Sequence, residues 1–596
     1  MLFEKKIKET VLSIVSSLYS GEFTEESVQI QKTKKDFSGD FTLVVFPFVR
    51  YSKKSVDDTA KEIGDNLLKK LSFIKEYSVI KGFLNLAIRD EIWLEYFNSV
   101  REKEPLFDME NQNQSPVVVE YSSPNTNKPL HLGHIRNNLL GDAICNILQA
   151  NKYNVIRVNL VNDRGIHICK SMLAWIKSAN GQTPQSSGLK GDKFVGKYYV
   201  EFDRMYKEEL TDLQLNGLSR DEAEKQSKIM LEAQQMLQKW EENNEEIRAL
   251  WTKMNSWVYD GFDKTYKTLG IKFDKIYYES DTYLLGKEIV EDGLNKNVFY
   301  KHEDGSIRVN LENEGLDEKV LLRADGTSVY ITQDLGTATL RANEFNPQKM
   351  IYVVGNEQNY HFEVLKLILD KKLGYDFGKT IYHLSYGMVE LPSGKMKSRE
   401  GTVVDADDLV ENMIEIAREN TDKLGKTDNF TEEQLKNLSS MIGIGALKYF
   451  ILKIDPKKNM LFNPQESIDL NGNTAPFIQY THARIRSLLR KANEQGIDIN
   501  KTINLSSIPQ QERELLRILY EYTSVVKQAG NELSPALIAN YIYELVKAYN
   551  HFYQDSPILR EENDELRIYR LQLSLYTADV VKNAMKLLGI DVPEQM

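Results

Sequence analysis

A strand, a loop, a helix and a second strand follow one another between residues 117 and 160, and this order constrains the fold more than any other feature. Residues 117–121 form an apolar run typical of a buried strand, 132–150 have the periodicity of a helix, and 153–160 form another strand. Strands joined by a helix lie parallel, because the helix crosses over one face of the sheet. The pattern resumes with a strand at 349–354, a helix at 362–371 and a strand at 381–389, which predicts a parallel α/β sheet.

The N-terminal part of the chain predicts a small α/β domain over residues 1–110. It combines a helix near 7–18 with β-rich runs at 41–46 and 82–86. The polar stretch 109–116 ends in a proline and is typical of a linker.

Two further segments depart from the sheet pattern. The insertion at about 186–260 is dense in Lys, Glu and Gln, and it predicts long helices on the outside of the sheet. From about 430 onward the periodicity is helical throughout, with an example in Tyr541, Leu545, Ala548 and Phe552. We therefore expect an α/β domain over 111–430 and an all-α bundle over 431–596.

Composition limits the classes of protein that this chain can belong to. The two cysteines, Cys145 and Cys169, are too few for a disulfide framework, and the spacing of Cys and His predicts no zinc site. We expect a reducing, cytoplasmic setting and no membrane contact, because no apolar run reaches the roughly 18 residues that a span needs. The net charge of −11 argues against a general nucleic-acid binder. Residues 441–596 carry 18 Lys/Arg and 18 Asp/Glu, so any RNA surface must be a local patch.

The loop before the helix at 132–150 places polar groups where ligands bind to parallel sheets. Ligands bind at the carboxyl ends of the strands, and a helix N-terminus there offers unpaired N–H groups to phosphate. His131 and His134 are three residues apart, so both can donate to phosphate oxygens, and Gly133 lets a base or sugar approach the backbone. Taken alone, two such histidines can equally cap the helix or line a core, whereas a metal site would need a third ligand. The motif comprises Pro124, Asn125, Thr126, Asn127, Lys128, Pro129, Leu130, His131, Leu132, Gly133 and His134.

A second motif follows the strand predicted at 381–389. Glycines flank a loop with three cationic side chains, Lys395, Lys397 and Arg399, which a flexible clamp on a triphosphate requires. A bare charge run of this kind is more often a solvated loop. The two motifs together are more specific than either, because each follows a strand of the same expected sheet.

With both motifs in this order, the chain resembles the class I aminoacyl-tRNA synthetases. His131-Leu132-Gly133-His134 is similar to their His-Ile-Gly-His signature, and the segment 395–399 is similar to their Lys-Met-Ser-Lys-Ser loop. The second match departs from the family, since Ser398 and then Arg399 stand where the second lysine is expected. Arginine-specific members often lack that lysine and carry one before the histidine signature, where this chain has Lys128.

The resemblance is closest to the arginyl-tRNA synthetases and extends over nearly all of the chain. It implies a Rossmann-type catalytic domain, a small N-terminal α/β domain that contacts tRNA, and a C-terminal anticodon-binding bundle. It also implies that the amino acid is held by Glu120, Asn125, Tyr330, Asp334 and Gln358. A guanidinium group needs carboxylates and an aromatic face or hydroxyl, which Asp334, Glu120 and Tyr330 would supply if the helix begins at about Asp334. Each acid can instead form a surface ion pair, and Glu120 can instead support another site residue.

The activity implied is an ATP-dependent ligation of L-arginine to tRNA(Arg), through arginyl-adenylate. The substrate carboxylate is already a nucleophile, so catalysis needs alignment and charge stabilisation by His131, His134, Lys128 and Lys395. The ATP site would also include Gly133, Met388, Val389, Met396, Ser398 and Arg399, with Mg²⁺ on the triphosphate. Family members commonly need tRNA before they activate arginine, and we expect a monomer.

Aromatic and cationic side chains of the C-terminal bundle are candidates for stacking on RNA bases, although a stripe of this kind is more often core. They are Tyr480, His482, Arg484, Arg486, Tyr549, His551 and Tyr553. Three rival interpretations stay open: a shorter nucleotidyltransferase-type enzyme with a similar histidine signature, another class I synthetase, and an inactive RNA-binding paralogue.

Overall fold

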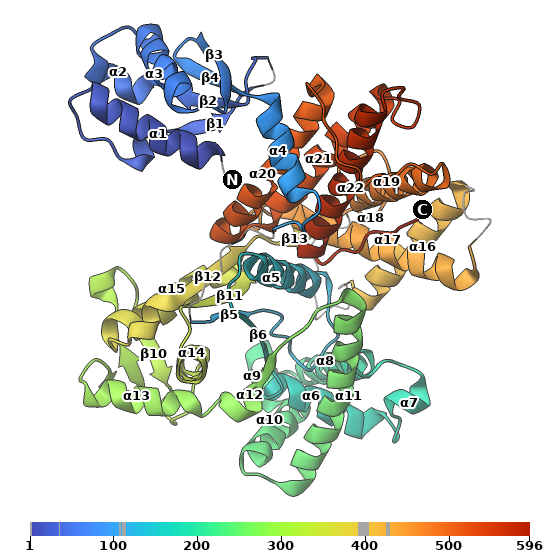
Figure 1. Ribbon diagram of the computed structural model, residues 1–596. Coiled ribbons are helices and arrows are strands. Elements are labelled where there is room, and N and C mark those ends of the chain that lie inside the picture. The colour runs from blue at the N-terminus through green and yellow to red at the C-terminus, as the bar shows by residue number, and fades with distance from the viewer. Residues whose placement is uncertain are drawn as a thin grey trace. The chain divides into compact units, whose positions relative to one another are not determined.

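The computed structural model describes residues 3–34, 36–106, 109, 115–390, 392, 404–424 and 430–596 (Figure 1). The linker predicted at 109–116 and the cationic loop at 395–399 therefore lie partly or wholly outside the described residues. The chain divides into two compact units. Unit 1 comprises residues 1–107, 485–522 and 545–580, and unit 2 comprises residues 108–484, 523–544 and 581–596.

Unit 2 is built on a five-stranded sheet whose strand order is β12-β11-β5-β6-β7. Each neighbouring pair of strands is parallel. Helix α5 (Leu132–Ala150) connects β5 to β6, which confirms the predicted crossover. The strands are β5 (Val117–Glu120), β6 (Val155–Val161), β7 (Lys275–Tyr278), β11 (Lys349–Gly355) and β12 (Ile381–Tyr386).

Helices cover both faces of this sheet (Figure 1). On one face, the Tyr121 ring packs so closely on Gly141 of α5 that a Cβ at position 141 would lie 2.2 Å from the ring. On the other face, Leu335 of α14 (Tyr330–Phe345) shares a buried core with Val118 and Val158. Because side chains alternate along a strand, Glu120 lies on the same face as Val118 and therefore on the side of α14.

The strand predicted at 381–389 is interrupted, and this part of the prediction was wrong. β12 ends at Tyr386, and β13 (Val389–Glu390) pairs instead with β14 (Met460–Leu461) in a separate two-stranded sheet. The chain turns at Gly387, where a Cβ would lie 2.5 Å from the backbone of Lys458. Only glycine allows the two backbones to approach this closely.

The predicted insertion consists of long helices, as expected. They are α8 (Gly191–Leu215), α9 (Arg220–Gln226), α10 (Lys228–Glu241) and α11 (Glu245–Leu269), preceded by α6 (Ile166–Ser178) and α7 (Pro184–Ser187). The last of them runs past the predicted end at about 260 and leads directly into β7. Asn159 of β6 donates a hydrogen bond to the Tyr266 hydroxyl of α11 at 3.4 Å, so this last helix reaches the sheet and does not lie wholly outside it.

A segment that the periodicity did not resolve connects β7 to α14. It contains α12 (Glu279–Thr282), α13 (Leu285–Asn295) and a three-stranded antiparallel sheet of β8 (Tyr300–Lys301), β9 (Ile307–Val309) and β10 (Lys319–Leu322). After β11, helix α15 (Asn359–Leu367) ends in a π-helical turn at Ile368–Lys372, close to the predicted helix at 362–371.

The N-terminal part of unit 1 is a small α/β fold, as expected. Its four-stranded antiparallel sheet has the order β1-β2-β4-β3. The elements are α1 (Phe3–Leu18), β1 (Ile30–Lys32), β2 (Phe41–Val44), α2 (Phe46–Ser52), α3 (Val56–Lys70), β3 (Ile74–Ile80), β4 (Phe83–Ile88) and α4 (Asp90–Val100).

The C-terminal part of the chain is helical, as predicted, apart from the short strand β14. Its helices are α16 (Ala406–Leu424), α17 (Glu432–Leu452), α18 (Pro464–Ser467), α19 (Ala475–Glu494), α20 (Gln510–Glu532), α21 (Pro535–Asp555) and α22 (Asp564–Leu587). The boundary between the two units runs through α19, α20, α21 and α22.

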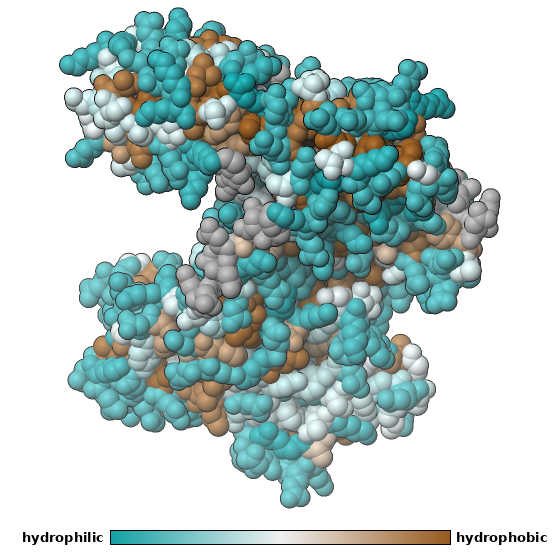
Figure 2. Space-filling view, in the orientation of Figure 1, coloured by the Kyte–Doolittle hydropathy of each residue, from teal (hydrophilic) through white to brown (hydrophobic). Residues whose placement is uncertain are grey.

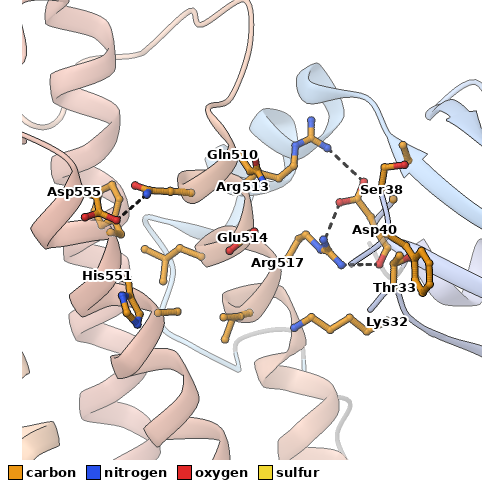
Figure 3. A pocket seen from close by; sticks show the side chains of 18 residues that line it. Lys32, Thr33, Ser38, Asp40, Gln510, Arg513, Glu514, Arg517, His551 and Asp555 are labelled. Carbon is orange, nitrogen blue, oxygen red and sulfur yellow. Dashed lines mark hydrogen bonds and ion pairs between the residues drawn. The ribbon is translucent and has the colours of Figure 1, made fainter. Parts of the chain in front are cut away.

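Within unit 1, the N-terminal fold packs directly on segments of these helices. The Phe3 ring stacks on Tyr520 of α20 at 5.2 Å between centroids. The buried carboxylate of Asp40 lies 3.4 Å from Arg513 and 3.5 Å from Arg517 (Figure 3). These contacts border a cavity of about 500 Å³ that Lys32, Glu514 and His551 also line (Figure 3).

Hydrophilic residues cover most of the face shown in Figure 2, and hydrophobic residues show between them. Among the described residues, no helix is both long enough and apolar enough to cross a bilayer.

Candidate active site

The turn after β5 has an unusual backbone that positions the whole histidine motif. Ser122 and Ser123 both have a left-handed conformation, with φ of 80° and 45°. Such a conformation costs on the order of 1–3 kcal/mol per residue outside glycine. The side chain of Asn137 accepts a hydrogen bond from the Ser122 amide at 2.5 Å, and that of Asn159 accepts one from the Ser123 amide at 3.0 Å. The turn is therefore held by α5 and β6, and it leaves Asn125 exposed at the carboxyl end of β5.

His131 and His134 close the N-terminus of α5 through their Nδ1 atoms. The Gly133 amide donates to Nδ1 of His131 at 3.1 Å, and the His131 amide donates to Nδ1 of His134 at 3.2 Å. Each Nδ1 is an acceptor, so the proton of each neutral ring lies on Nε2. Burial and Lys128 lower the pKa of His131 to about 4, and burial, His131 and Lys128 lower the pKa of His134 well below its usual value. Both rings are thus neutral donors, so capping and ligand binding are compatible.

The rest of the motif supports this helix start. The ring centroids of His131 and His134 are 3.9 Å apart, and a Cβ at Gly133 would lie 3.0 Å from the nearest atom of the His131 ring. Glycine at this position therefore leaves room for the His131 ring. Pro124, Thr126, Asn127, Leu130 and Leu132 are buried, whereas Lys128 and Pro129 are half-buried.

A cavity of about 240 Å³ lies beside the motif and is lined by Lys128, His131, Lys193 and Lys197 among others. Lys193 comes from insertion helix α8 and forms ion pairs with Asp408 at 2.6 Å and with Asp405 at 3.5 Å. The insertion therefore contributes cationic side chains next to the histidine motif.

The buried guanidinium of Arg136 ties α5 to the segments that follow β12. It donates to the carbonyls of Met388 at 3.1 Å, Pro456 at 3.1 Å and Lys458 at 2.7 Å. The Met388 carbonyl also accepts from the Met460 amide, and the Met388 amide donates to the Asn459 side chain at 2.8 Å. The Met388 backbone is therefore already hydrogen-bonded within the protein. Val389 is paired with Met460 of β14. In a parallel ladder Met460 bonds to the residues before and after Val389, so the backbone amide and carbonyl of Val389 point away from β14.

The cationic-loop residues Lys395, Met396, Ser398 and Arg399 lie outside the described residues. The described residues on either side of that loop lie beside α5. Arg136 binds the Met388 carbonyl before it, and the Leu132 amide donates to the Val404 carbonyl at 3.3 Å after it. The Ala406 amide also donates to the Leu130 carbonyl at 2.9 Å.

Tyr330 and Asp334 lie one turn apart on α14, which begins at Tyr330 and not at Asp334 as predicted. The N-cap position holds Val329, whose side chain has no hydrogen-bond acceptor, so the sequence carries no capping signal there. The Tyr330 side chain is 79% exposed. The carboxylate of Asp334 lies 2.6 Å from Nε2 of His361, on α15.

Glu120 lies within the sheet face and already has a cationic partner. Its carboxylate forms an ion pair with Arg341, which is 1% exposed, and accepts a hydrogen bond from the Ser123 hydroxyl at 3.0 Å. Because Arg341 already pairs with it, the Glu120 carboxylate has less negative charge available to a bound cation than the Asp334 carboxylate has. Gln358 is exposed just beyond the carboxyl end of β11.

Glu279 is a site residue that the sequence did not indicate. It is half-buried and directly follows β7. The charge of Asp334 acts on its carboxylate, which also accepts a hydrogen bond from the Gln333 side chain. Burial raises the pKa of Glu279 to about 7, and the nearby Asp163 and Asp334 add to the shift, while Arg164 opposes it. A strand prediction for β7 would have revealed it, because acids at strand carboxyl ends are ligand candidates.

The described residues contain no group of three or more His, Cys, Asp or Glu side chains arranged to hold a metal ion. Cys145 and Cys169 are buried thiols, and burial raises the pKa of Cys169 to about 12. Neither cysteine is placed to act as a ligand or nucleophile, because the thiolate is the reactive form.

The C-terminal aromatic and cationic candidates divide into core and surface. Tyr549 and His482 are buried, and His482 Nδ1 lies 2.9 Å from the Pro593 carbonyl. Arg484 lies over the half-buried Tyr480 ring at 4.8 Å, and His551 is exposed. Arg486 and Tyr553 are half-buried.

Comparison with known proteins assigns the chain to a family. Residues 98–463 match the model described as tRNA synthetases class I (R), catalytic domain, and residues 478–596 match the DALR anticodon binding domain. The chain is 57% identical over 598 residues to the arginine–tRNA ligase of Parabacteroides distasonis, and the match covers 100% of both proteins. It is 56% identical to that of Bacteroides thetaiotaomicron, again over 100% of both.

Solved structures show the same fold. The chain superposes on Thermus thermophilus arginyl-tRNA synthetase with a TM-score of 0.81 at 23% identity, covering 100% of both chains. The corresponding values for the Plasmodium falciparum arginyl-tRNA synthetase are 0.78 and 22%, covering 100% of this chain and 99% of that one. The parallel α/β sheet with its histidine motif, the helical C-terminal region and the full-length relatives all agree: the chain belongs to the arginyl-tRNA synthetases of class I.

Proposed function

We propose that this chain joins L-arginine to the 3′ end of tRNA(Arg) in two steps, with ATP as the energy source. Arginine first attacks the α-phosphorus of ATP, which forms arginyl-adenylate and releases pyrophosphate. A terminal ribose hydroxyl of the tRNA then attacks the adenylate and releases AMP. The observation that carries the proposal is the placement of phosphate donors (His131, His134) and guanidinium-binding acids (Asp334, Glu279) at the carboxyl ends of one parallel sheet.

In the first step, the neutral histidines donate from Nε2 to phosphate oxygens of ATP. This role needs no proton transfer, since the arginine carboxylate is already ionised, and it matches charge stabilisation in the transition state. Lys128 adds a positive charge beside His131, where it compensates for the lysine that the cationic loop lacks. From the resemblance, Lys395, Met396, Ser398 and Arg399 close over the phosphates from the other side.

Mg²⁺ accompanies the triphosphate in this proposal. Its ligands would be mainly phosphate oxygens and water, since Mg²⁺ is usually bound in this way at nucleotide sites. The adenine ring would bind along the backbone near Met388 and Val389. Because the Met388 amide and carbonyl are bound to Asn459, Arg136 and Met460, we assign the adenine contact to Val389 and the side chain of Met388.

The guanidinium of arginine would lie between Asp334 and Glu279. Two carboxylates suit a planar, permanently charged group with five donors, and the exposed Tyr330 ring offers a face or hydroxyl next to Asp334. Glu120 and the exposed amides of Asn125 and Gln358 would bind the α-amino and α-carboxyl groups. Glu120 would accept a hydrogen bond from the α-ammonium group while it keeps its ion pair with Arg341.

We assign to each region of the chain the role that the corresponding region has in the family. Residues 111–430 carry the chemistry, residues 431–596 read the anticodon, and residues 1–110 contact the tRNA outside the anticodon. The anticodon-domain match at 478–596 supports the second assignment. The exposed His551 and the stacked pair Tyr480 and Arg484 are the bundle residues that we assign to RNA contact. The protein would act as a monomer in the cytoplasm.

The proposal is tested by charging tRNA(Arg) with each amino acid in the presence of ATP and Mg²⁺. Arginine alone should be loaded, and ATP–pyrophosphate exchange should depend on arginine. Loading of another amino acid, or of none, would contradict the proposal.

A second test addresses the proposed binding site for the arginine side chain, which is formed by Asp334, Glu279 and Tyr330 and is called the slot below. Asp334→Asn keeps a hydrogen-bond partner for His361 and removes the charge, so KM for arginine should rise about 100-fold, or roughly 3 kcal/mol. KM for ATP should change little. The matched variant Glu344→Gln alters an acid on the same helix whose partners are Lys275 and Tyr277, and it should leave KM for arginine unchanged. Equal effects of the two substitutions would remove Asp334 from the slot.

A further inference from the structure

Asp163 has no assigned role in the proposed site, yet its carboxylate is fully engaged at the carboxyl end of β6. It is 1% exposed. Its Oδ1 accepts a hydrogen bond from the Ser280 amide at 2.9 Å, and its Oδ2 accepts from the Ser280 and Tyr259 hydroxyls at 2.8 Å each. Burial raises the pKa of Asp163, and these hydrogen bonds oppose the shift. Burial of this carboxylate costs desolvation of a charge, and the hydrogen bonds offset part of that cost and fix its orientation.

The same residue is held from behind by one face of insertion helix α11. Trp251, Asn255 and Tyr259 are spaced four residues apart, so they lie along one side of that helix. The Trp251 indole donates to the Asp163 carbonyl at 2.6 Å, and the Asn255 amide donates to it at 3.3 Å. With Tyr259 on the carboxylate, α11 fixes both the backbone and the side chain of Asp163.

What Asp163 fixes in turn is the start of α12, where Glu279 is the first residue and Ser280 the second. A helix of four residues has little stability of its own, so the orientation of its first turn depends on outside contacts. Asp163 binds the backbone amide that directly follows Glu279. Rotation about that peptide would turn the Glu279 carboxylate away from Asp334 and from an arginine side chain between them.

We propose that Asp163 is a positioning residue for arginine: it links insertion helix α11 to Ser280 and so fixes the guanidinium-binding carboxylate of Glu279. The inference rests on the proposed function, because it presumes that Glu279 contacts the substrate. It goes beyond it by assigning the insertion, through Trp251, Asn255 and Tyr259, a part in amino acid selection.

The test compares variants in KM for arginine and KM for ATP during tRNA charging. Asp163→Ala should raise KM for arginine about 30-fold with KM for ATP within about twofold, since the lost contact is remote from the reacting atoms. Ser280→Ala and Tyr259→Phe remove one hydroxyl each and should raise KM for arginine by about threefold. Asp260→Ala, at an exposed position of the same helix, is the matched control and should have no effect.

A double-mutant cycle separates positioning from a general structural role. In a Glu279→Gln background, Asp163→Ala should raise KM for arginine by less than about threefold, because the residue through which it acts is already impaired. Full additivity of the two effects, or an equal rise in KM for ATP, would overturn the inference. If Asp163→Ala does not fold, Asp163→Asn and Ser280→Ala carry the same cycle, with thermal unfolding as the measure of stability.

The two levels of the proposal fail differently. A wild-type protein that does not load arginine would remove the proposed function. A wild-type protein that loads arginine while the Asp163 and Ser280 variants keep a normal KM for arginine would remove only the positioning role.

Discussion

Each histidine of the motif caps α5 through Nδ1, and we propose that its Nε2 atom has a second, chemical task. Nδ1 of His134 accepts from the His131 amide, and Nε2 is left to donate to a ligand. A substitution that keeps the acceptor and removes the donor can therefore separate the two tasks. Asparagine comes close to this condition. Its side-chain oxygen occupies a position similar to that of Nδ1, and its amide nitrogen lies near the position of Cδ2, so no donor remains at the position of Nε2.

We expect His134→Ala and His134→Asn to lower the rate of arginine activation alike, by about 10²–10³-fold, since both lose the donor to phosphate. They should differ in stability. His134→Ala loses the cap and should be less stable than His134→Asn by about 1 kcal/mol. Pyrophosphate exchange and denaturant unfolding measure the two effects, and a normal rate in His134→Asn would assign the histidine to capping alone.

If Glu279 binds the guanidinium as proposed, the affinity for arginine should depend on pH near neutrality. Its pKa is raised to about 7 by burial, with Asp163 and Asp334 adding to the shift and Arg164 opposing it. Below that pH the group is protonated and neutral, and it cannot pair with a guanidinium. The kcat/KM for arginine should therefore fall as pH is lowered through about 7, by about tenfold per pH unit.

Glu279→Gln tests whether this dependence belongs to Glu279, since the charges of Asp163, Asp334 and Arg164 also act on that residue and His361 pairs with Asp334. The variant should have a low kcat/KM at all pH values and should lose the dependence near neutrality. His131, with its pKa of about 4, stays neutral throughout this range and does not contribute. A profile unchanged by the substitution would exclude Glu279 from the slot.

Candidate residues of the site could be named from the sequence where neighbours in the chain are also neighbours in space. His131, Gly133 and His134 occupy one helix start, so a local motif reveals them. Glu279 follows a strand of only four residues between a long helix and irregular chain, where periodicity gives no signal. The ion pair of Glu120 with Arg341 joins residues more than 200 positions apart in the chain, which no local pattern encodes.

At the scale of elements, the β5–α5–β6 crossover was predictable because each element has a strong periodicity and a typical length. The start of α14 was not, because Val329 precedes it in place of a capping residue. Nor was the break after β12, which depends on the close approach of Gly387 to the backbone of Lys458. Contacts between elements, rather than the elements' own sequences, set both boundaries.

Arg136 is the contact that holds α5 against the segments beyond β12. Arg136→Met would leave the carbonyls of Met388, Pro456 and Lys458 without this donor and should lower the free energy of unfolding by about 2–4 kcal/mol. KM for ATP should rise about tenfold, because the backbone that we propose to bind adenine would shift, while KM for arginine should stay unchanged. Arg136→Lys keeps part of the donor capacity and should be intermediate in both. Equal increases in the two KM values would contradict this role.

At the scale of the whole molecule, a linear division of the chain does not match its compact units. The polar stretch at 109–116 indicated a separate N-terminal domain, yet residues 1–107 form one unit with parts of α19, α20, α21 and α22. Helical periodicity predicts that a bundle forms but not which of its segments pack on a distant domain. The N-terminal fold and these segments of the C-terminal helices therefore form one compact unit.

Substitution of Asp40 tests whether the packing of the N-terminal fold on the C-terminal helices contributes to stability. The Asp40 side chain is 2% exposed, accepts a hydrogen bond from the Ile88 amide at 2.7 Å, and faces Arg513 and Arg517 (Figure 3). Asp40→Ala would leave two half-buried guanidinium groups without this carboxylate, which should cost about 3–5 kcal/mol in the free energy of unfolding of unit 1. Because the candidate active-site residues lie in unit 2, KM for arginine and KM for ATP should stay normal.

The same variant should raise KM for tRNA severalfold, since residues of unit 1 are assigned to RNA contact. Calorimetric unfolding and charging kinetics at varied tRNA measure the two effects. The control is Asp65→Ala, which alters an exposed acid of α3 that bonds to Tyr77 on the N-terminal fold itself, and it should leave KM for tRNA unchanged. If Asp40→Ala melts normally and charges tRNA normally, the contact between the N-terminal fold and α20 contributes neither to stability nor to tRNA binding, and the two parts of unit 1 act separately.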